Sequence, residues 1–328
     1  MFMASQNPQK LEKIRDDIEL PIIDLHSNRS QAISQIIKAC EQYGFFKVIN
    51  HGVPQEIISR MEHEAHHFFS KPGSEKQRAG PANPYGYGCK NIGLNGDMGE
   101  IEYLLLQTNS HHHPKYVSND PNNFRCAVIG YVAAVEELAC ELLDMMGEGL
   151  LGGPHSCWAR DLSGLIRDPE SDSVFRLNHY PASSSPAKIG FGEHTDPQIL
   201  TLLRSNDVGG LQISTQDGVW VPVSPYPESA FCVNVGDVLQ VMTNGRFMSV
   251  RHRAVVNSFN PRMSMAYFAG PPLNAPICCL PGLATLQKPP IYRAFTWGEY
   301  KKATYARRLG DTRLNLFKLL PNDESNVE

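Results

Sequence analysis

The segments Val174-Phe-Arg-Leu-Asn-His-Tyr-Pro181 and Gly190-Phe-Gly-Glu-His-Thr-Asp-Pro-Gln-Ile-Leu200 begin a series of short stretches with β-strand character. Gly, Pro, Asn and Asp separate these stretches at intervals of about 8 to 12 residues, a spacing typical of an antiparallel sandwich or barrel. Helical periodicity returns only near Thr296. We therefore predict a β-barrel over residues 174–295.

The first half of the chain predicts helices with a few short strands. Apolar residues recur at helical spacing in three segments, 30–44, 54–70 and 124–150. In the first segment Ser30 is the expected N-cap and Gly44 ends the helix. Strands are expected at Leu20–Leu25 and Phe45–Asn50, and a glycine-rich loop at Gly80–Gly99. Near the end, Thr296-Trp-Gly-Glu299 is a capping-box pattern that predicts a helix to Leu309.

These elements predict one catalytic unit with four parts. We expect an N-terminal module of helices and strands over 1–110, a connecting loop and a long core-packing helix over 111–173, the barrel over 174–295, and a C-terminal helix and tail over 296–328. The fold class is then mainly β with α.

Composition favours a cytoplasmic protein that acts on small molecules. The formal net charge of -4 gives no field that would gather nucleic acid or an anionic membrane. No apolar run reaches the roughly 20 residues of a membrane helix, and the polar start is unlike a secretory signal. The eight cysteines lack disulfide-framework spacing, so we expect reduced thiols.

Two side chains in the β-rich part have the spacing of metal ligands. His194 and Asp196 stand two residues apart, and in a strand such residues project to the same face. A chain with 12 histidines produces a His-x-Asp pair by chance, so a surface histidine is the alternative. With His252 from a later strand as third ligand, the set would be two imidazoles and a carboxylate. This facial arrangement leaves coordination positions open and is typical of non-haem iron(II) oxygenases.

Further pairs at the same spacing point to an acidic co-substrate. Arg262 and Ser264 combine a guanidinium, which can bind a carboxylate through two hydrogen bonds, with a hydroxyl. Asn178 and Tyr180 add polar side chains to the same β region. The alternative for Arg262 is a surface ion pair, but three such pairs in one region favour a site for 2-oxoglutarate.

The chain resembles the plant 2-oxoglutarate/iron(II) dioxygenase family almost from end to end. The resemblance rests on Leu20-Pro-Ile-Ile-Asp-Leu25, Ala39-Cys-Glu-Gln-Tyr-Gly-Phe-Phe-Lys-Val-Ile-Asn-His-Gly-Val53, Asn206-Asp-Val-Gly-Gly-Leu-Gln-Ile213, Trp220-Val-Pro-Val223, Asn234-Val-Gly-Asp237 and Thr243-Asn-Gly-Arg-Phe-Met-Ser-Val-Arg-His-Arg253. It implies a double-stranded β-helix, or jelly roll, flanked by N-terminal helices and a C-terminal helix. It also implies iron(II) on His194, Asp196 and His252, and 2-oxoglutarate on Arg262, Ser264 and Tyr180. The co-substrate O2 and support by ascorbate belong to the same resemblance.

Three stretches resemble the gibberellin 2-oxidases in particular. They are Gly86-Tyr-Gly88 to Ile92-Gly-Leu-Asn-Gly-Asp-Met-Gly-Glu-Ile-Glu-Tyr-Leu-Leu-Leu106, Gly190 to Leu200, and Leu203-Arg-Ser-Asn206. The first has the form found in members that act on 19-carbon gibberellins. The resemblance implies 2β-hydroxylation, which inactivates the hormone and its precursors.

A gibberellin pocket needs an apolar wall and donors for the substrate carboxylate. The candidates are Tyr85, Tyr87, Met98, Tyr103, Leu105, Phe247 and Phe268 for the wall, and Lys90, Arg78 or Lys301 for the carboxylate. Ordinary core packing or a solvated charge is an equal alternative for each of them.

Other functions stay open at this point. A gibberellin 3-oxidase or a flavonoid oxygenase would share the iron and co-substrate residues, and a hormone-binding jelly-roll protein without turnover is an alternative of another class. We interpret His63, His66 and His67 as a solvated helix face and His111-His-His113 as a loop. The sequence leaves the oligomeric state and regulation open.

Overall fold

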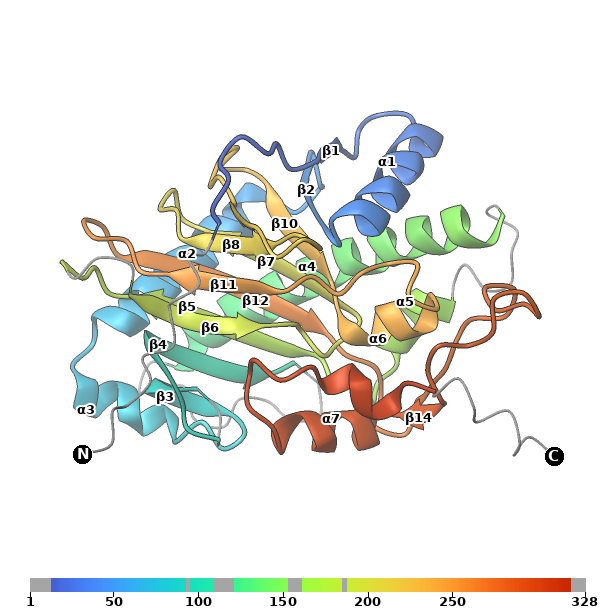
Figure 1. Ribbon diagram of the computed structural model, residues 1–328. Coiled ribbons are helices and arrows are strands. Elements are labelled where there is room, and N and C mark those ends of the chain that lie inside the picture. The colour runs from blue at the N-terminus through green and yellow to red at the C-terminus, as the bar shows by residue number, and fades with distance from the viewer. Residues whose placement is uncertain (1–12, 93–94, 109–120, 153–160, 185–187, 320–328) are drawn as a thin grey trace, which may run out of the picture.

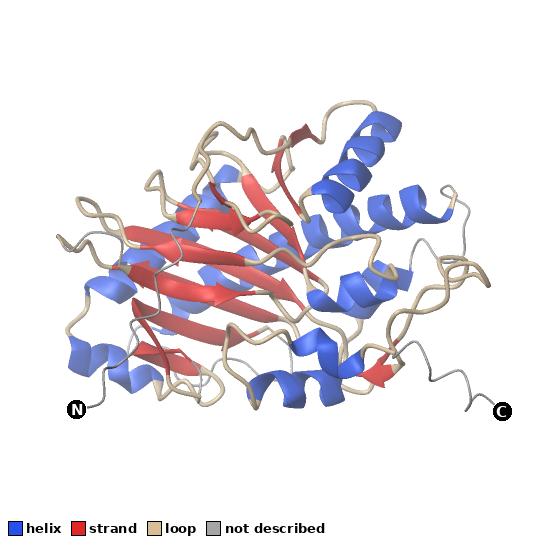
Figure 2. Ribbon diagram, in the orientation of Figure 1, coloured by secondary structure: helices blue, strands red, loops and turns tan. Residues whose placement is uncertain are grey.

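The computed structural model describes residues 13–92, 95–108, 121–152, 161–184 and 188–319. Two sheets form a jelly-roll core, with helices packed around it (Figures 1 and 2). The larger sheet has eight strands in the order β1-β2-β10-β7-β12-β5-β4-β3, and the smaller has four in the order β6-β11-β8-β9. A further pair, β13-β14, lies apart from both sheets.

The strands are β1 (Ile22–Asp24), β2 (Phe45–Ile49), β3 (Gly86–Ile92), β4 (Asp97–Gln107), β5 (Val174–Tyr180), β6 (Ile189–His194), β7 (Leu200–Ser205), β8 (Leu211–Ser214), β9 (Trp220–Pro222), β10 (Phe231–Val235), β11 (His252–Val255), β12 (Arg262–Ala269), β13 (Pro276–Ile277) and β14 (Phe295–Thr296). The helices are α1 (Arg29–Gln42), α2 (Gln55–Ser70), α3 (Gly73–Lys76), α4 (Pro121–Leu151), α5 (Asp161–Arg167), α6 (Asp237–Met242) and α7 (Trp297–Tyr305), with 3-10 turns η1 (Gln77–Ala79) and η2 (Arg313–Phe317).

The larger sheet separates the hydrophobic core from the interior of the jelly roll. Side chains alternate along a strand, so Phe175 and Leu177 of β5 point to the outer face, where they join the main core with residues of α4. The rings of Tyr131 and Phe175 lie 5.3 Å apart there. The intervening side chains Arg176 and Asn178 point to the opposite side and line a cavity. One strand thus serves both the core and the cavity.

The expected loop over Gly80–Gly99 is wrong, because β3 and β4 form an antiparallel hairpin in this region. Glycine is present in β3 for close packing: the ring of Tyr103 occupies the space that a Cβ of Gly88 would need. The hairpin adds two strands to the larger sheet through pairing of β4 with β5. Its outer strand carries an irregularity at Lys90, where φ is 62° and the register with β4 shifts.

The helix boundaries differ from the predictions at two caps. The side chain of Asn28, and not Ser30, accepts a hydrogen bond at the start of α1, from the backbone N–H of Ser30. At α7 the prediction of Thr296 as N-cap is confirmed, since its hydroxyl accepts from the N–H of Glu299 at 3.2 Å. The helix nevertheless ends at Tyr305 and not at Leu309.

A buried carboxylate ties the hairpin to the rest of the protein. Glu102 of β4 accepts hydrogen bonds from Lys76 Nζ and Tyr87 Oη, both at 2.6 Å, and lies 2.8 Å from Nδ1 of His179. Burial alone would raise the pKa of Glu102, but these three partners outweigh burial and lower the pKa to about 2. The carboxylate therefore stays ionised and joins four separate segments.

We expect Glu102→Gln to lower the free energy of unfolding at neutral pH, by about 3 kcal/mol if the whole shift from 4.5 is expressed as stability. Because the folded-state pKa is depressed, this contribution is present above the pKa of the unfolded chain and is lost as pH falls towards the folded value. The difference in free energy of unfolding between wild type and variant should therefore be about 1 kcal/mol smaller at pH 3.5 than at pH 6. Urea unfolding at both pH values measures it, and a difference that is constant with pH would contradict the assignment.

Candidate metal centre and adjoining cavity

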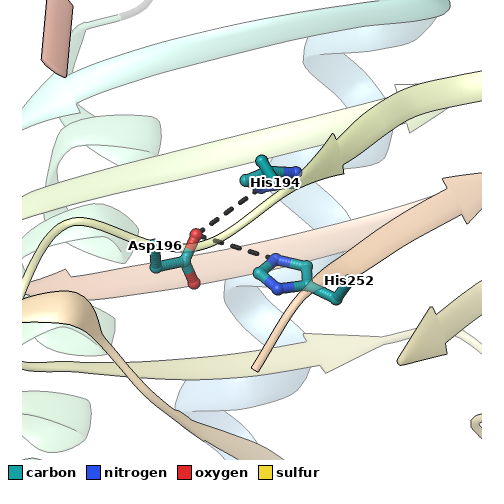
Figure 3. Close-up of side chains that lie close together, drawn as sticks. All are labelled: His194, Asp196 and His252. Atoms are coloured by element: carbon teal, nitrogen blue, oxygen red, sulfur yellow. Dashed lines mark ion pairs between the residues drawn. The ribbon is translucent and has the colours of Figure 1, made fainter. Parts of the chain in front are cut away.

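Three side chains converge at the end of the smaller sheet that faces the cavity. His194 ends β6 and His252 begins β11, and the two residues are direct partners in the antiparallel register. Asp196 follows two residues after His194, and its Oδ1 lies 3.6 Å from Nε2 of each histidine. One potential ligand atom from each residue falls within 4.8 Å of the others (Figure 3). The sequence prediction that these residues lie together is confirmed.

Neighbouring groups orient all three side chains for a metal. Each histidine has its Nδ1 against a backbone carbonyl, that of Gly192 at 2.7 Å and that of Val250 at 3.1 Å. A proton on Nδ1 leaves the Nε2 lone pair directed towards the other ligands. The other oxygen of Asp196, Oδ2, accepts hydrogen bonds from Thr201 at 2.6 Å and Asn234 at 2.7 Å, so Oδ1 is left to face the imidazoles.

The protonation states suit a cation. Burial, together with the nearby His252, lowers the pKa of His194 to about 4, so this imidazole is neutral near pH 7. Burial would raise the pKa of Asp196, but His252 and His194 outweigh it and hold the pKa well below its usual range. Neutral imidazoles and an ionised carboxylate are the states in which these side chains bind metal. The donor set therefore fits iron(II) with a facial arrangement of two histidines and a carboxylate.

A cavity of about 60 Å³ lies beside the triad. Residues of both sheets line it, and one wall is a double row from β5 and β12. In the register of these strands Arg262 pairs with Tyr180 and Ser264 pairs with Asn178. Three of the four predicted co-substrate residues, Asn178, Tyr180 and Arg262, line the cavity. The fourth, Ser264, belongs to the same row, and its Oγ lies 3.3 Å from Nδ2 of Asn178.

Arg262 is a buried cation, only 2% exposed. Burial lowers the pKa of its guanidinium, but an arginine stays charged in a protein. Its Cζ lies 5.3 Å from the centre of the Tyr180 ring, and its Nε has no hydrogen-bond partner among the described residues. The alternative of a surface ion pair is thereby ruled out, and the cavity wall presents a guanidinium suited to a carboxylate.

Arg176 is a second cavity arginine, and sequence reasoning missed it. It belongs to the same inward row of β5 as Asn178 and Tyr180. The signal was the same spacing of two residues, continued one step towards the start of the strand, but the pattern was followed only as far as Asn178.

Some of the predicted substrate residues lie in the cavity lining or next to it. Phe268 lines the cavity. Tyr103 lies beside it, with its ring centre 4.0 Å from Cζ of Arg176, and Leu105 is the register partner of Arg176. The hydroxyl of Tyr87 is used by Glu102.

The remaining candidates do not line this cavity. Phe247 is fully buried in the main hydrophobic core, so its assignment to the pocket is wrong. Met98 and Lys90 are exposed on the hairpin, and Tyr85 is half-buried outside the lining. Lys301 is held by Asp172 at 2.6 Å, and Arg78 is an exposed residue outside the cavity lining.

Several smaller predictions also have an outcome. His63, His66 and His67 are exposed along α2, as expected for a solvated face. The cysteines within the described ranges are free thiols. Cys157 and the run His111–His113 lie outside the described residues. Among the described helices, none is long and apolar enough to cross a bilayer.

Comparison with known proteins identifies the class. Residues 171–271 match the 2OG-Fe(II) oxygenase superfamily, and residues 20–124 match the N-terminal region of a non-haem dioxygenase in morphine synthesis. The crystal structure of JOX2 in complex with 2OG, Fe and JA is similar with a TM-score of 0.82 and 28% identity, covering 96% of this chain and 92% of the other. The crystal structure of a dioxygenase for auxin oxidation in rice is similar with a TM-score of 0.75 and 26% identity, covering 92% and 100%. The chain belongs to the 2OG-Fe(II) oxygenase superfamily, whose members use iron(II) and 2-oxoglutarate.

The individual relatives narrow this class. Gibberellin 2-beta-dioxygenase 4 of Arabidopsis thaliana is 54% identical over 325 residues, covering 94% of this chain and 97% of the relative. Gibberellin 2-beta-dioxygenase 1 of Pisum sativum is 52% identical over 304 residues, covering 91% and 90%. Both alignments extend across the N-terminal region and the barrel.

Proposed function

We propose that the protein is a gibberellin 2-beta-dioxygenase, which inactivates gibberellins by hydroxylating the 2β position with 2-oxoglutarate as co-substrate. The observation that carries this function is the 54% identity, over almost the full length of both chains, to a relative of that name. The reaction converts a substrate C–H bond, O2 and 2-oxoglutarate into a C–OH group, succinate and carbon dioxide.

We assign the metal to His194, Asp196 and His252. Their spacing of 3.6 Å between Oδ1 and each Nε2 supports this role, as do the carbonyls behind both imidazoles. Iron(II) bound there supplies the oxidative chemistry with O2. Thr201 and Asn234 orient the carboxylate of Asp196, because both donate hydrogen bonds to Oδ2 and leave Oδ1 towards the histidines.

We assign 2-oxoglutarate to the row on β5 and β12. Arg262 would bind the carboxylate distant from the metal, with Ser264 and Tyr180 as further polar contacts and Asn178 holding the hydroxyl of Ser264 in place. The buried Nε of Arg262, which has no hydrogen-bond partner within the described ranges, supports this assignment.

The apolar part of the cavity would position the substrate. Phe191, Phe268 and Leu211 line it, and the ring of Phe191 lies 4.4 Å from the ring of His194. Walls of this kind exclude water and hold a rigid ring system by contact area. Regiochemistry then depends on which carbon the walls bring next to the metal.

Two further assignments accompany this function. We propose a cytoplasmic location, supported by the free thiols of the described cysteines. We also propose that residues 174–295 carry the reaction and that residues 1–110, 111–173 and 296–328 support them, in line with the two matched regions.

A panel of gibberellins tests the proposal. With iron(II), 2-oxoglutarate, O2 and ascorbate, we expect a 2β-hydroxylated product from at least one 19-carbon gibberellin, with succinate formed in matching amount. Mass spectrometry of the product and assay of succinate measure this, and reactions without iron or 2-oxoglutarate are the controls. A 3β-hydroxylated product, or turnover of flavonoids alone, would identify a sister enzyme. Gibberellin binding without succinate would identify a binding protein.

A further inference from the structure

Two aromatic rings contact Arg176 in the cavity. Its Cζ lies 4.0 Å from the centre of the Tyr103 ring and 4.7 Å from that of Phe191. Such cation–π contacts restrict the orientation of a guanidinium and leave its N–H groups to donate hydrogen bonds. One donor, Nε, is used by Oδ1 of Asn178 at 2.7 Å.

The guanidinium keeps a buried donor that no described residue satisfies. Nη2 is buried and has no hydrogen-bond partner among the described residues, and no carboxylate within the described ranges forms an ion pair with Arg176. Leaving a buried charge unpaired is costly. The cost is removed when an anion enters the cavity and accepts from the free edge.

The position of Arg176 separates it from the co-substrate arginine. Arg176 pairs with Ala266 on β12, whereas Tyr180 pairs with Arg262. Four residues along a strand correspond to roughly 13 Å. The Phe191 ring contacts both Arg176 and the ring of His194, so a group bound to Arg176 lies close to the metal ligands.

We propose that Arg176, held by Tyr103 and Phe191, is the subsite for the carboxylate of the substrate and makes the enzyme selective for acids over neutral molecules of the same shape. This inference rests on the proposed function, because it takes the gibberellin acid as substrate. Arg176 replaces Lys90, Arg78 and Lys301, the candidates suggested by the sequence. It anchors one end of the rigid ring system while the apolar walls determine which carbon faces the metal.

The test compares a gibberellin acid with its methyl ester, which keeps the shape and removes the charge. For the wild type we expect KM of the ester to be roughly 10- to 100-fold higher, the range of a charge-assisted hydrogen-bonded pair. In Arg176→Gln the acid should lose this advantage, so that the ratio of the two KM values falls to about 1. KM for 2-oxoglutarate should stay as in the wild type. Arg176→Lys keeps the charge but not the fork or the stacking, and should give an intermediate ratio.

Arg246→Gln is the matched control. It removes a guanidinium that is paired with Glu41 at 2.6 Å, outside the cavity lining, and should preserve the wild-type ratio. Thermal melting of each variant establishes that it is folded, and Arg176→Lys carries the comparison if Arg176→Gln does not melt cooperatively. An unchanged ratio in the folded Arg176 variants would overturn the proposal. So would a raised KM for 2-oxoglutarate at an unchanged ratio, because Arg176 would then serve the co-substrate. Failure of the wild type to hydroxylate any gibberellin would instead refute the proposed function.

Discussion

Asp196→Ala should abolish succinate formation and hydroxylation together. The variant loses the carboxylate of the triad and keeps two imidazoles, which bind a divalent cation far more weakly than the full set. Loss of a group that only supports a ligand typically costs 10- to 100-fold in metal affinity or activity, so we expect the loss of the ligand itself to exceed about 100-fold. Iron content after desalting and succinate release measure both effects.

Asp217→Asn is the matched control for this change. Asp217 is an exposed residue between β8 and β9 whose carboxylate accepts a hydrogen bond from the hydroxyl of Thr215. Its replacement should preserve iron content and turnover. If the Asp196→Ala protein kept wild-type iron content and turnover, the assignment of Asp196 as a metal ligand would be contradicted.

Arg262→Ala should raise the KM for 2-oxoglutarate by roughly 10- to 150-fold, the equivalent of about 1.5–3 kcal/mol for a hydrogen bond to a charged group. The reason is the buried guanidinium, whose Nε finds no partner among the described residues and whose neighbours in the row are polar. Initial rates at varied 2-oxoglutarate and saturating gibberellin measure the effect.

The direction of the change distinguishes Arg262 from Arg176. KM for gibberellin should change little in Arg262→Ala, and Arg246→Gln should change neither constant. If Arg262→Ala raised the KM for gibberellin and not that for 2-oxoglutarate, the assignment of the two arginines would have to be exchanged.

The co-substrate part of the site that sequence reasoning predicted follows one physical rule, the alternation of side chains along a strand. This rule predicts that Arg262 lies next to Ser264 and Asn178 next to Tyr180, whereas Asp196 lies two residues past the end of β6, where alternation no longer applies. It could not say which strands are neighbours. The register that brings His252 opposite His194 depends on closure of the smaller sheet.

The errors arose where tertiary contacts decide the outcome. The glycines of Gly86-Tyr-Gly88 resemble loop residues by composition, but the packing of Tyr103 against Gly88 makes them strand residues. Phe247 and Lys301 have side chains suited to a pocket. Phe247, however, is enclosed in the core, and Lys301 forms an ion pair with Asp172. The two-residue spacing of Tyr180 and Asn178 extends to Arg176, but this spacing alone does not distinguish a buried arginine from a solvated one.

The irregularity at Lys90 has a consequence for solubility. β3 is the last strand of the larger sheet, and a regular edge strand offers unpaired backbone groups to other chains. The turn of the backbone at Lys90 interrupts that row, its lysine side chain is exposed, and the start of the strand is covered by the bridge between Pro81 and Tyr87. The opposite edge, β1, is three residues long and follows Pro21. Neither border of the sheet gives a second molecule a long template for intermolecular β-sheet growth, so concentrated protein is protected from fibril-like aggregation at these borders.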